Sequence, residues 1–180
     1  AALSETAEIH LTSFRKESLQ GGSVLRSIYD NLNVSSHFEG DTLILKKENK
    51  PLPTSLKLDL SKAPDIAQTI AVSCYGLGIG CDLVGLHTLK IKETDRLEAL
   101  NTELSKLGAT IKVTENSLHL SPGINFKENC SIPTYNDHRM AMAFAPLALK
   151  IPLQIEASDV VSKSYPDFWK DMKKLNFQLN

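Results

Sequence analysis

The hydrophobic positions of the chain repeat every second residue in some stretches and about every 3.6 residues in others, which predicts alternating strands and helices. Strands are predicted over residues 7–14, 54–60, 81–89, 129–135 and 151–160, and hairpins over residues 34–47 and 109–121. The hairpins are expected to turn at Gly40–Asp41 and at Glu115–Asn116. Helices are predicted over residues 21–32, 63–78, 91–108, 138–150 and 165–175.

These predicted elements recur along the chain. Leu32, Leu107 and Leu175 occupy equivalent places at helix ends, which indicates units with a period of about 70 residues. Each unit is expected to run approximately β-α-β-β-β-α, so the fold class is α/β or α+β, built from related units. The glycines of "GLGIG" (residues 76–80) follow a helix instead of opening one. They therefore predict a helix stop and a turn, and not a nucleotide-binding loop.

Two of the predicted helices carry proline signals. Pro64 suits the first turn of the helix over residues 63–78. The helix over residues 138–150 is apolar on all sides, so we expect it to be buried. Pro146 inside this helix predicts a kink or an early break.

Composition narrows the function classes. The chain has 180 residues, is 42% hydrophobic and 23% charged, and has a net charge of -1, so no global field favours nucleic acid or a membrane surface. Its three cysteines and five histidines lack the spacing of a disulfide framework or a metal cluster. No segment is long and apolar enough to cross a bilayer. The chain begins without Met, and we expect it to be a piece of a larger protein.

The charges at the start of the helix over residues 91–108 are unusual. With the helix taken to include Lys92, Glu93 falls on the leucine-rich side, Arg96 lies beside it, and Asp95 faces water. A carboxyl partly desolvated at the lip of the core suits proton transfer. The alternative is that Glu93 only favours the helix dipole and pairs with Arg96. This alternative does not account for Lys92, whose charge opposes the dipole, whereas a bound anion would.

Other predicted helices also begin with charged residues. Asp137 is a good N-cap for the apolar helix, but a cap leaves Arg139 beside that helix unexplained. Lys163 precedes a helix led by Pro166, and Asp65 lies in a first turn. Taken singly, Lys163 is an ordinary solvated charge and Asp65 an ordinary first-turn acid.

If related units pack alike, their helix starts gather on one side. The expected cluster contains four cations and two acids: Lys92, Arg96, Arg139 and Lys163, with Asp65 and Glu93. Several cations together with positive helix ends suit a substrate that carries phosphate and carboxylate groups, and two carboxyls suit proton transfer.

Three segments carry a family resemblance. "KETDRLEAL" with the "EL.KLGA" that follows (residues 92–109), "YNDHRMAMAFA" (135–145) and "SKSYPDFW" (162–169) together resemble 5-enolpyruvylshikimate-3-phosphate (EPSP) synthases, the 3-phosphoshikimate 1-carboxyvinyltransferases. Residues 15–25 and 64–72 resemble family segments more loosely. The resemblance covers nearly the whole chain, so residues 1–180 are expected to form the C-terminal domain of such an enzyme.

The resemblance implies a fold and an activity. The fold is an inverse-wound domain of βαβαββ units, as in enolpyruvyl transferases and RNA 3'-terminal cyclases, with helix N-termini facing a cleft between two domains. The activity is transfer of the enolpyruvyl group of phosphoenolpyruvate to the 5-hydroxyl of shikimate 3-phosphate, with release of phosphate, in aromatic amino-acid biosynthesis. The resemblance further implies a cytoplasmic monomer of the glyphosate-target family that needs no metal or organic cofactor. The N-terminal domain is missing from this chain, so the chain is expected to be inactive alone.

The matching motifs also imply residue roles. Arg96 and Arg139 would hold the phosphoenolpyruvate carboxylate, and Lys163 would meet its phosphate side. His138 would line the same pocket, and Glu93 would carry a proton at the methylene carbon. Asp65, a candidate base, and Lys92 would lie by the shikimate 5-hydroxyl. Thr88 stands where the family often has an Asn that binds shikimate 3-phosphate. Which acid moves which proton stays open, and the shorter Thr88 hydroxyl puts that one contact in doubt.

The residue pattern by itself also allows two other functions. The same cationic cluster would suit a free-standing anion-binding module without catalysis. Within the enzyme class, the enolpyruvyl acceptor would be a nucleotide sugar, as in a sister family that shares the fold but lacks the two most specific motifs.

Overall fold

The middle of the chain forms one complete βαβαββ unit in the computed structural model, which describes residues 1–12 and 24–179. Its elements are β4 (Ser55–Asp59), a 3-10 turn (Pro64–Ile66), α2 (Ala67–Leu77), β5 (Gly80–Val84), a second 3-10 turn (His87–Ile91), α3 (Arg96–Lys106), β6 (Ile111–Val113) and β7 (Ser117–Leu120). The strands form a sheet in the order β4-β5-β7-β6, in which β4 and β5 are parallel and the other neighbours antiparallel.

The segments on either side repeat the two halves of this unit. The N-terminal elements are β1 (Glu8–Leu11), α1 (Leu25–Asp30), β2 (Val34–Glu39) and β3 (Thr42–Lys47), and their sheet order β1-β3-β2 matches β5-β7-β6. The C-terminal elements are β8 (Cys130–Ile132), α4 (His138–Phe144), a 3-10 turn (Ala145–Leu149), β9 (Leu153–Ile155), a 3-10 turn (Ser158–Lys163) and α5 (Phe168–Lys174). Strands β8 and β9 are parallel, as β4 and β5 are, so the predicted repeat is confirmed.

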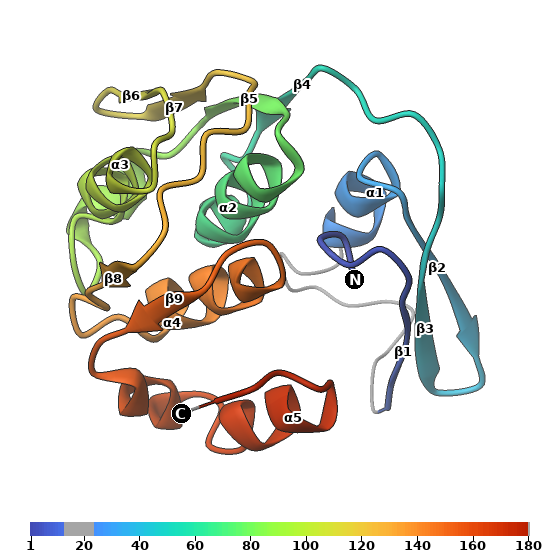
Figure 1. Cartoon of the computed structure of the whole chain (residues 1–180). Helices are drawn as coiled ribbons and strands as arrows, with labels where there is room; N and C mark the ends of the chain where they lie inside the picture. The colour runs from blue at the N-terminus through green and yellow to red at the C-terminus, as the bar shows by residue number, and fades with distance from the viewer. Residues whose placement is uncertain (13–23, 180) are drawn as a thin grey trace.

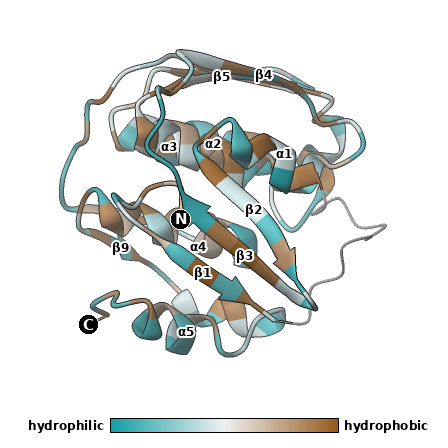
Figure 2. Cartoon of the chain, turned by 90° about the vertical axis from the view of Figure 1, so that its right-hand side faces the viewer, coloured by the Kyte–Doolittle hydropathy of each residue, from teal (hydrophilic) through white to brown (hydrophobic). Residues whose placement is uncertain are grey.

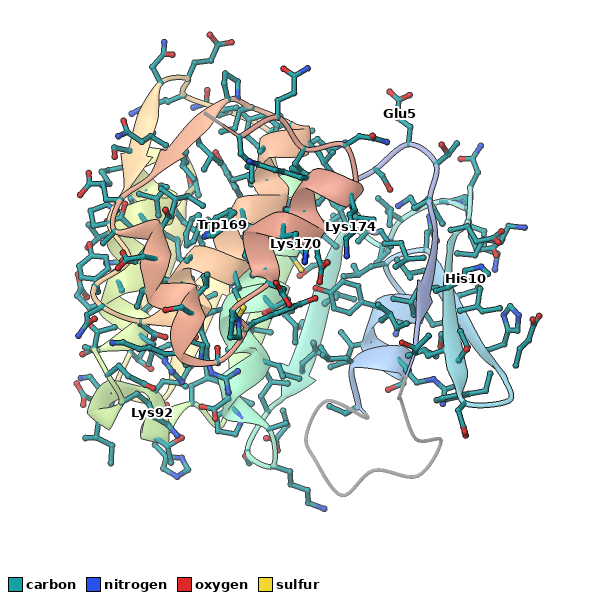
Figure 3. The ribbon with its side chains drawn as sticks, turned by 90° about the horizontal axis from the view of Figure 1, so that it is seen from below. Glu5, His10, Lys92, Trp169, Lys170 and Lys174 are labelled. Carbon is teal, nitrogen blue, oxygen red and sulfur yellow. The ribbon has the colours of Figure 1, made fainter. Side chains whose placement is uncertain are left out.

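The sheets lie toward the outside and α2 lies near the centre, with α2 and α3 beneath the sheet that contains β4 and β5 (Figures 1 and 2). Nine of the eleven residues of α2 are buried. This helix packs against both α3 and α4, so the starts of three helices from two units lie close together. A smaller apolar cluster, formed by α4 and the 3-10 turn at Ser158–Lys163, packs against α5, on which Trp169 lies (Figure 3).

Several local predictions are confirmed. Helix α2 ends at Gly78, whose φ of 72° is left-handed, and Ile79 N donates to Cys74 O at 3.0 Å. This is the helix stop expected of "GLGIG". Helix α4 ends just before Pro146, where the chain tightens into a 3-10 turn, as Pro146 predicts. The hairpin of β2 and β3 turns at Gly40–Asp41, as expected.

Other predictions need correction or lie outside the described part. The helix predicted over residues 91–108 begins at Arg96, and the helix predicted over residues 165–175 begins at Phe168. The family segment at residues 15–25 falls mostly on residues 13–23, which the structure does not describe. Among the residues it does describe, no helix has the length and hydrophobicity of a membrane span.

Candidate functional site

A buried ion pair between Arg96 and Asp137 lies at the centre of the candidate site. Arg96 is the first residue of α3, and its side chain is 2% exposed, while Asp137 precedes α4 and its side chain is 0% exposed. Arg96 Nε donates to Asp137 Oδ2 at 2.7 Å, and Nη2 lies 3.4 Å from Oδ1. Asp137 Oδ1 also accepts from Arg139 N at 2.9 Å, as the predicted N-cap should. One carboxylate thus caps α4 and joins it to α3.

Two further carboxylates complete the surroundings of Arg96. Its Nη1 donates to Asp65 Oδ1 at 2.9 Å, and its Nη2 donates to Glu93 Oε2 at 2.7 Å. Asp65, from the turn before α2, also pairs with Lys92 Nζ at 3.3 Å and lies 3.6 Å from Arg139 Nη2. Every nitrogen of the Arg96 guanidinium is therefore engaged, whereas Lys92 and Arg139 keep part of their side chains in solvent.

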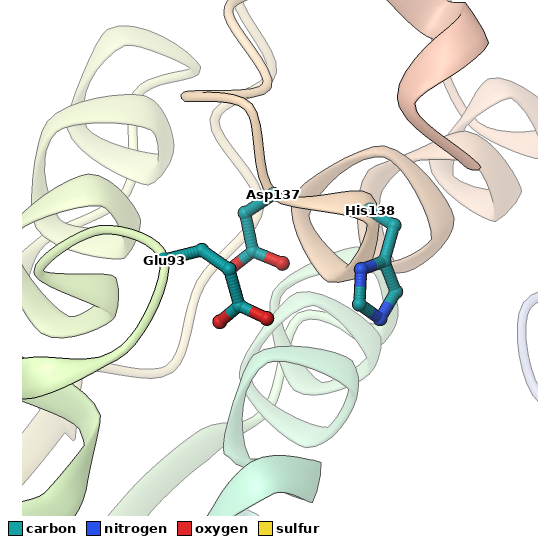
Figure 4. A group of neighbouring side chains, drawn as sticks. All are labelled: Glu93, Asp137 and His138. Atoms are coloured by element: carbon teal, nitrogen blue, oxygen red, sulfur yellow. The ribbon is translucent and has the colours of Figure 1, made fainter. Parts of the chain in front are cut away.

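Lys163 and His138 reach the same place from the C-terminal unit. Lys163 Nζ donates to Asn136 Oδ1 at 2.7 Å, and Asn136 directly precedes Asp137. His138 is the first residue of α4. Its ring lies beside the carboxylates of Glu93 and Asp137, with one ligand atom of each residue within 4.8 Å of the others (Figure 4). The structure thus brings together all the predicted site residues but one.

Thr88 is the exception. It lies in the 3-10 turn before Lys92, and its Oγ1 is buried without a hydrogen-bond partner among the described residues. This hydroxyl keeps an unused donor, but because it is closed to solvent, a ligand can reach it only after neighbouring side chains move. The structure records no contact between this hydroxyl and the rest of the network, so its predicted role stays a prediction.

The predicted orientation of Glu93 is wrong. Residues 92–95 precede α3, so the helical projection that placed Glu93 on the core side does not apply to them. The Glu93 side chain is 44% exposed, and the buried member of the segment is Arg96. Asp95 is the N-cap, because its Oδ1 accepts from Glu98 N at 3.1 Å. The signal was present in the sequence, since Asp followed three residues later by Glu resembles a capping box.

The charges leave a cationic surplus. Three carboxylates (Asp65, Glu93, Asp137) face four cations (Lys92, Arg96, Arg139, Lys163), so one positive charge is in excess when His138 is neutral. Because the buried Arg96 is already paired, this surplus is carried by the side chains that reach solvent. An anion meeting these side chains would find charge-assisted donors at helix starts.

The same geometry argues against a metal ion at Glu93, Asp137 and His138. Arg96 donates to both carboxylates, and Asp137 accepts in addition from Arg139 N. A metal ion bound there would have to compete with a guanidinium within hydrogen-bond distance of the same oxygens. These donors fit an ion-pair network, and they do not fit a metal centre.

Sequence reasoning missed two participants. Asp137 was expected only to cap α4, yet it is also the buried partner of Arg96. Asn136 was not singled out, yet it holds Lys163. A motif shows which charged residues are neighbours in the chain. It does not show the partners of Asp137 and Asn136, which lie 41 and 27 residues away.

Comparisons with known proteins point to one family. The sequence model of the family "EPSP synthase (3-phosphoshikimate 1-carboxyvinyltransferase)" matches residues 1–172. A 3-phosphoshikimate 1-carboxyvinyltransferase of Bacteroides fragilis is 42% identical over 180 residues, which cover 98% of this chain and 44% of that protein. Its counterpart in Clostridium novyi is 35% identical over 161 residues, covering 88% of this chain and 36% of that protein.

Solved structures show the same fold. An EPSP synthase from Acinetobacter baumannii superposes with a TM-score of 0.72 at 18% identity, over 97% of this chain and 43% of that one. The enolpyruvyl transferase NikO from Streptomyces tendae superposes with a TM-score of 0.63 at 17% identity, over 83% of this chain and 34% of that one. The fold class predicted from the sequence is thereby confirmed. The chain spans less than half the length of the curated relatives it matches.

Proposed function

Because the chain belongs to the EPSP synthase family, we propose that it is the C-terminal domain of an enzyme that transfers the enolpyruvyl group of phosphoenolpyruvate to the 5-hydroxyl of shikimate 3-phosphate. The observation that carries this proposal is the convergence of Arg96, Arg139, Lys163 and two exposed acids around the buried Asp137. A second domain would close the cleft and supply the remaining substrate contacts, so the isolated chain does not turn over. The enzyme acts as a cytoplasmic monomer, as the family resemblance implies.

Phosphoenolpyruvate carries a carboxylate and a phosphate, and the accessible cations suit both groups. Arg139 has a 38% exposed side chain, donates to the backbone oxygen of Asp65 at 3.2 Å and lies 3.6 Å from the Asp65 carboxylate, so it can exchange these contacts for a ligand. Lys163 is exposed, and Asn136 holds it near the N-terminus of α4, where it meets the phosphate side of phosphoenolpyruvate. His138 lines the same pocket. Arg139 and Lys163 can therefore turn to the ligand, because neither leaves a partner charge buried and unpaired when it does so.

Arg96 needs an exchange of partners to bind the substrate carboxylate. All three of its nitrogens are engaged, but the Glu93 side chain is 44% exposed and can leave for solvent at little cost. The substrate carboxylate then takes the place of Glu93 on Nη2, while Asp137 keeps Arg96 in position. Binding thus releases Glu93 next to the substrate, where it serves as the proton carrier.

The chemical step is an addition followed by an elimination. Asp65 accepts the proton of the 5-hydroxyl, and the hydroxyl oxygen attacks C2 of phosphoenolpyruvate. Glu93 gives a proton to the methylene carbon, and the product of this addition is a tetrahedral intermediate. The C–O bond to phosphate then breaks as the Glu93 carboxylate takes a proton from the new methyl group, which restores the double bond. Asp65 passes the hydroxyl proton to the departing phosphate, so both acids return to their starting states. Lys92 stabilises the oxygen beside Asp65, and Lys163 and Arg139 offset the charge that moves onto the departing phosphate. Thr88 Oγ1 hydrogen-bonds shikimate 3-phosphate.

Phosphate release by the full-length protein, with both substrates present, tests this proposal. Glu93→Gln should lower kcat by about 100-fold or more, the usual contribution of a general acid, while substrate binding is retained. Asp95→Asn is the matched control, because Asn keeps the N-cap of α3 and activity should stay unchanged. Equal losses at both positions would contradict the role of Glu93.

Three further outcomes decide the larger assignment. Full turnover by the isolated chain would contradict its role as one of two domains. If the full-length protein bound phosphoenolpyruvate without releasing phosphate, a non-catalytic anion-binding module would replace the enzyme. Turnover with a nucleotide sugar in place of shikimate 3-phosphate would change the acceptor.

A further inference from the structure

The turn that leads into α4 has a strained backbone. Tyr135 and Asn136 have φ of 54° and 56°, so two consecutive residues with side chains adopt the left-handed region. This conformation is uncommon outside glycine, and it persists only where the surrounding structure holds it. Asn136 and Asp137, which follow Tyr135 directly, are the partners of Lys163 and Arg96. Whatever holds this turn therefore also places two members of the candidate site.

A buried carboxylate outside the site holds the turn. Tyr135 donates its hydroxyl to Glu103 Oε1 at 2.5 Å, and the Glu103 side chain is 0% exposed. Burial, with the bond to Glu103, raises the pKa of Tyr135, so this hydroxyl stays a donor at neutral pH. Lys106 pairs with Glu103 Oε2 at 2.5 Å and also donates to Ser131 O in β8. The carboxylate is thus neutralised and tied to the strand that precedes the turn.

Glu103 and Arg96 lie on the same face of α3. They are seven residues apart, which is close to two helical turns, so their side chains leave the helix about 10 Å from each other in nearly the same direction. Arg96 holds Asp137 at the end of the turn, and Glu103 holds Tyr135 two residues earlier. Helix α3 therefore holds the strained turn at two points.

We propose that Tyr135 is a positioning residue of the anion site: its hydroxyl, bound to the buried Glu103, keeps the left-handed turn in the geometry that presents Asn136 to Lys163 and Asp137 to Arg96. Tyr135 acts through these neighbours and does not touch the substrate. Without its bond to Glu103, the turn relaxes toward negative φ and shifts the anchors of both cations. Displacements of about 1 Å at groups that orient a substrate are costly. The identity of the anion as phosphoenolpyruvate rests on the proposed function.

Kinetics of the full-length protein provide the first test. Tyr135→Phe should raise KM for phosphoenolpyruvate about tenfold, the effect of losing one hydrogen bond to a charged group, with a smaller change in kcat. Tyr29→Phe is the matched control, because the Tyr29 hydroxyl bonds to Ser73 Oγ at 2.7 Å and joins α1 to α2 away from the turn. It should leave KM within about twofold of the unsubstituted protein. A KM for Tyr135→Phe within the same limit overturns the inference.

A second variant separates positioning from stability. Tyr135→Phe leaves the Glu103 carboxylate buried with one donor fewer, which lowers stability. Combining it with Glu103→Met removes both polar groups, so the unfolding temperature should recover while KM for phosphoenolpyruvate stays raised. If KM recovers together with stability, Tyr135 acts through stability alone and the inference fails.

The Nε–H resonance of Arg96 gives a readout that needs no activity. In the full-length protein with labelled arginine, the bond to Asp137 should protect this hydrogen from exchange with water, and Tyr135→Phe should speed the exchange about tenfold or more. An unchanged exchange rate overturns the inference. If the unsubstituted protein does not use phosphoenolpyruvate, the proposed function fails, and this resonance still decides the role of Tyr135.

Discussion

Asp137→Asn tests the central ion pair because it changes the charge and preserves the helix cap. Asn accepts a hydrogen bond from the N–H of Arg139 as well as Asp does, so α4 keeps its N-cap. The substitution removes the negative charge that faces Arg96 Nε at 2.7 Å. Any loss of stability therefore reports on the buried pair and not on the start of the helix.

The size of the loss follows from burial. Removing one partner of a buried pair costs about 3–5 kcal/mol, because the other charge stays buried and uncompensated. Arg96 is 2% exposed, but it keeps Asp65 and Glu93, whose side chains reach solvent. We therefore expect the lower end, about 3 kcal/mol, which lowers the Tm by about 9 °C for a chain of this size.

Urea denaturation of the isolated chain measures the effect. The single tryptophan, Trp169, lies in α5 against the apolar cluster of α4 and reports unfolding by fluorescence. The midpoint should fall with an unchanged m value. Asp167→Asn is the matched control, since Asp167 also precedes a helix but pairs with Lys170 at 3.8 Å in solvent. It should leave the midpoint unchanged.

A double-mutant cycle makes the test strict. Arg96→Met alone leaves Asp137 buried without its partner, whereas Arg96→Met with Asp137→Asn leaves neither charge. The double variant should be more stable than the sum of the single losses predicts, by about 2 kcal/mol or more. A loss for Asp137→Asn no larger than that for Asp167→Asn, or a coupling energy near zero, would refute the reasoning.

Three further substitutions test other features of the fold. Gln68→Met should raise the free energy of unfolding by about 1–2 kcal/mol, because both polar atoms of this buried side chain lack hydrogen-bond partners among the described residues; a lower urea midpoint would contradict this. Burial raises the pKa of Tyr75 from 10.0 to about 12, so its neutral form stabilises the fold below pH 10 and this contribution is lost as the pH rises toward 12. Tyr75→Phe should therefore make the fall in urea midpoint between pH 9 and 11 shallower, and equal slopes would exclude this role. Gly108→Ala should lower the Tm more than Gly40→Ala does, because both have positive φ but only a Cβ at Gly108 would overlap the Asn125 carbonyl oxygen; equal shifts would argue against that close approach.

Hydrophobic periodicity and short polar signals were enough to predict most elements of the fold. Gly78 ends α2, Pro146 ends α4, and the β2–β3 hairpin turns at Gly40–Asp41, as expected. These features depend on backbone preferences and hydrogen bonds within a few residues, so the local sequence specifies them. The equivalence of Leu32 and Leu107 also indicated the repeat, because related units place similar residues at similar helix ends.

The start of α3 shows where periodicity alone was insufficient. The pattern of apolar residues is compatible with a helix from Lys92, and it placed Glu93 toward the core. The helix cannot begin at Lys92, because the Asp95 side chain accepts from Glu98 N and makes Asp95 the N-cap. Lys92 and Glu93 therefore lie in the segment before the helix. A local hydrogen bond decided the boundary, and reading the capping signal would have given the right one.

The charged residues of the site were visible as helix starts, but their partners and burial were not. Arg96 is buried because Asp65, Glu93 and Asp137 surround it, and the first and last of these lie more than 30 residues away in the chain. The desolvation of a guanidinium depends on every segment packed around it, and it is tolerated only where carboxylates from those segments meet it. Local sequence therefore accounts for where the helices begin and which charges stand there. The packing of α2, α3 and α4 decides which of these charges are buried and which reach solvent.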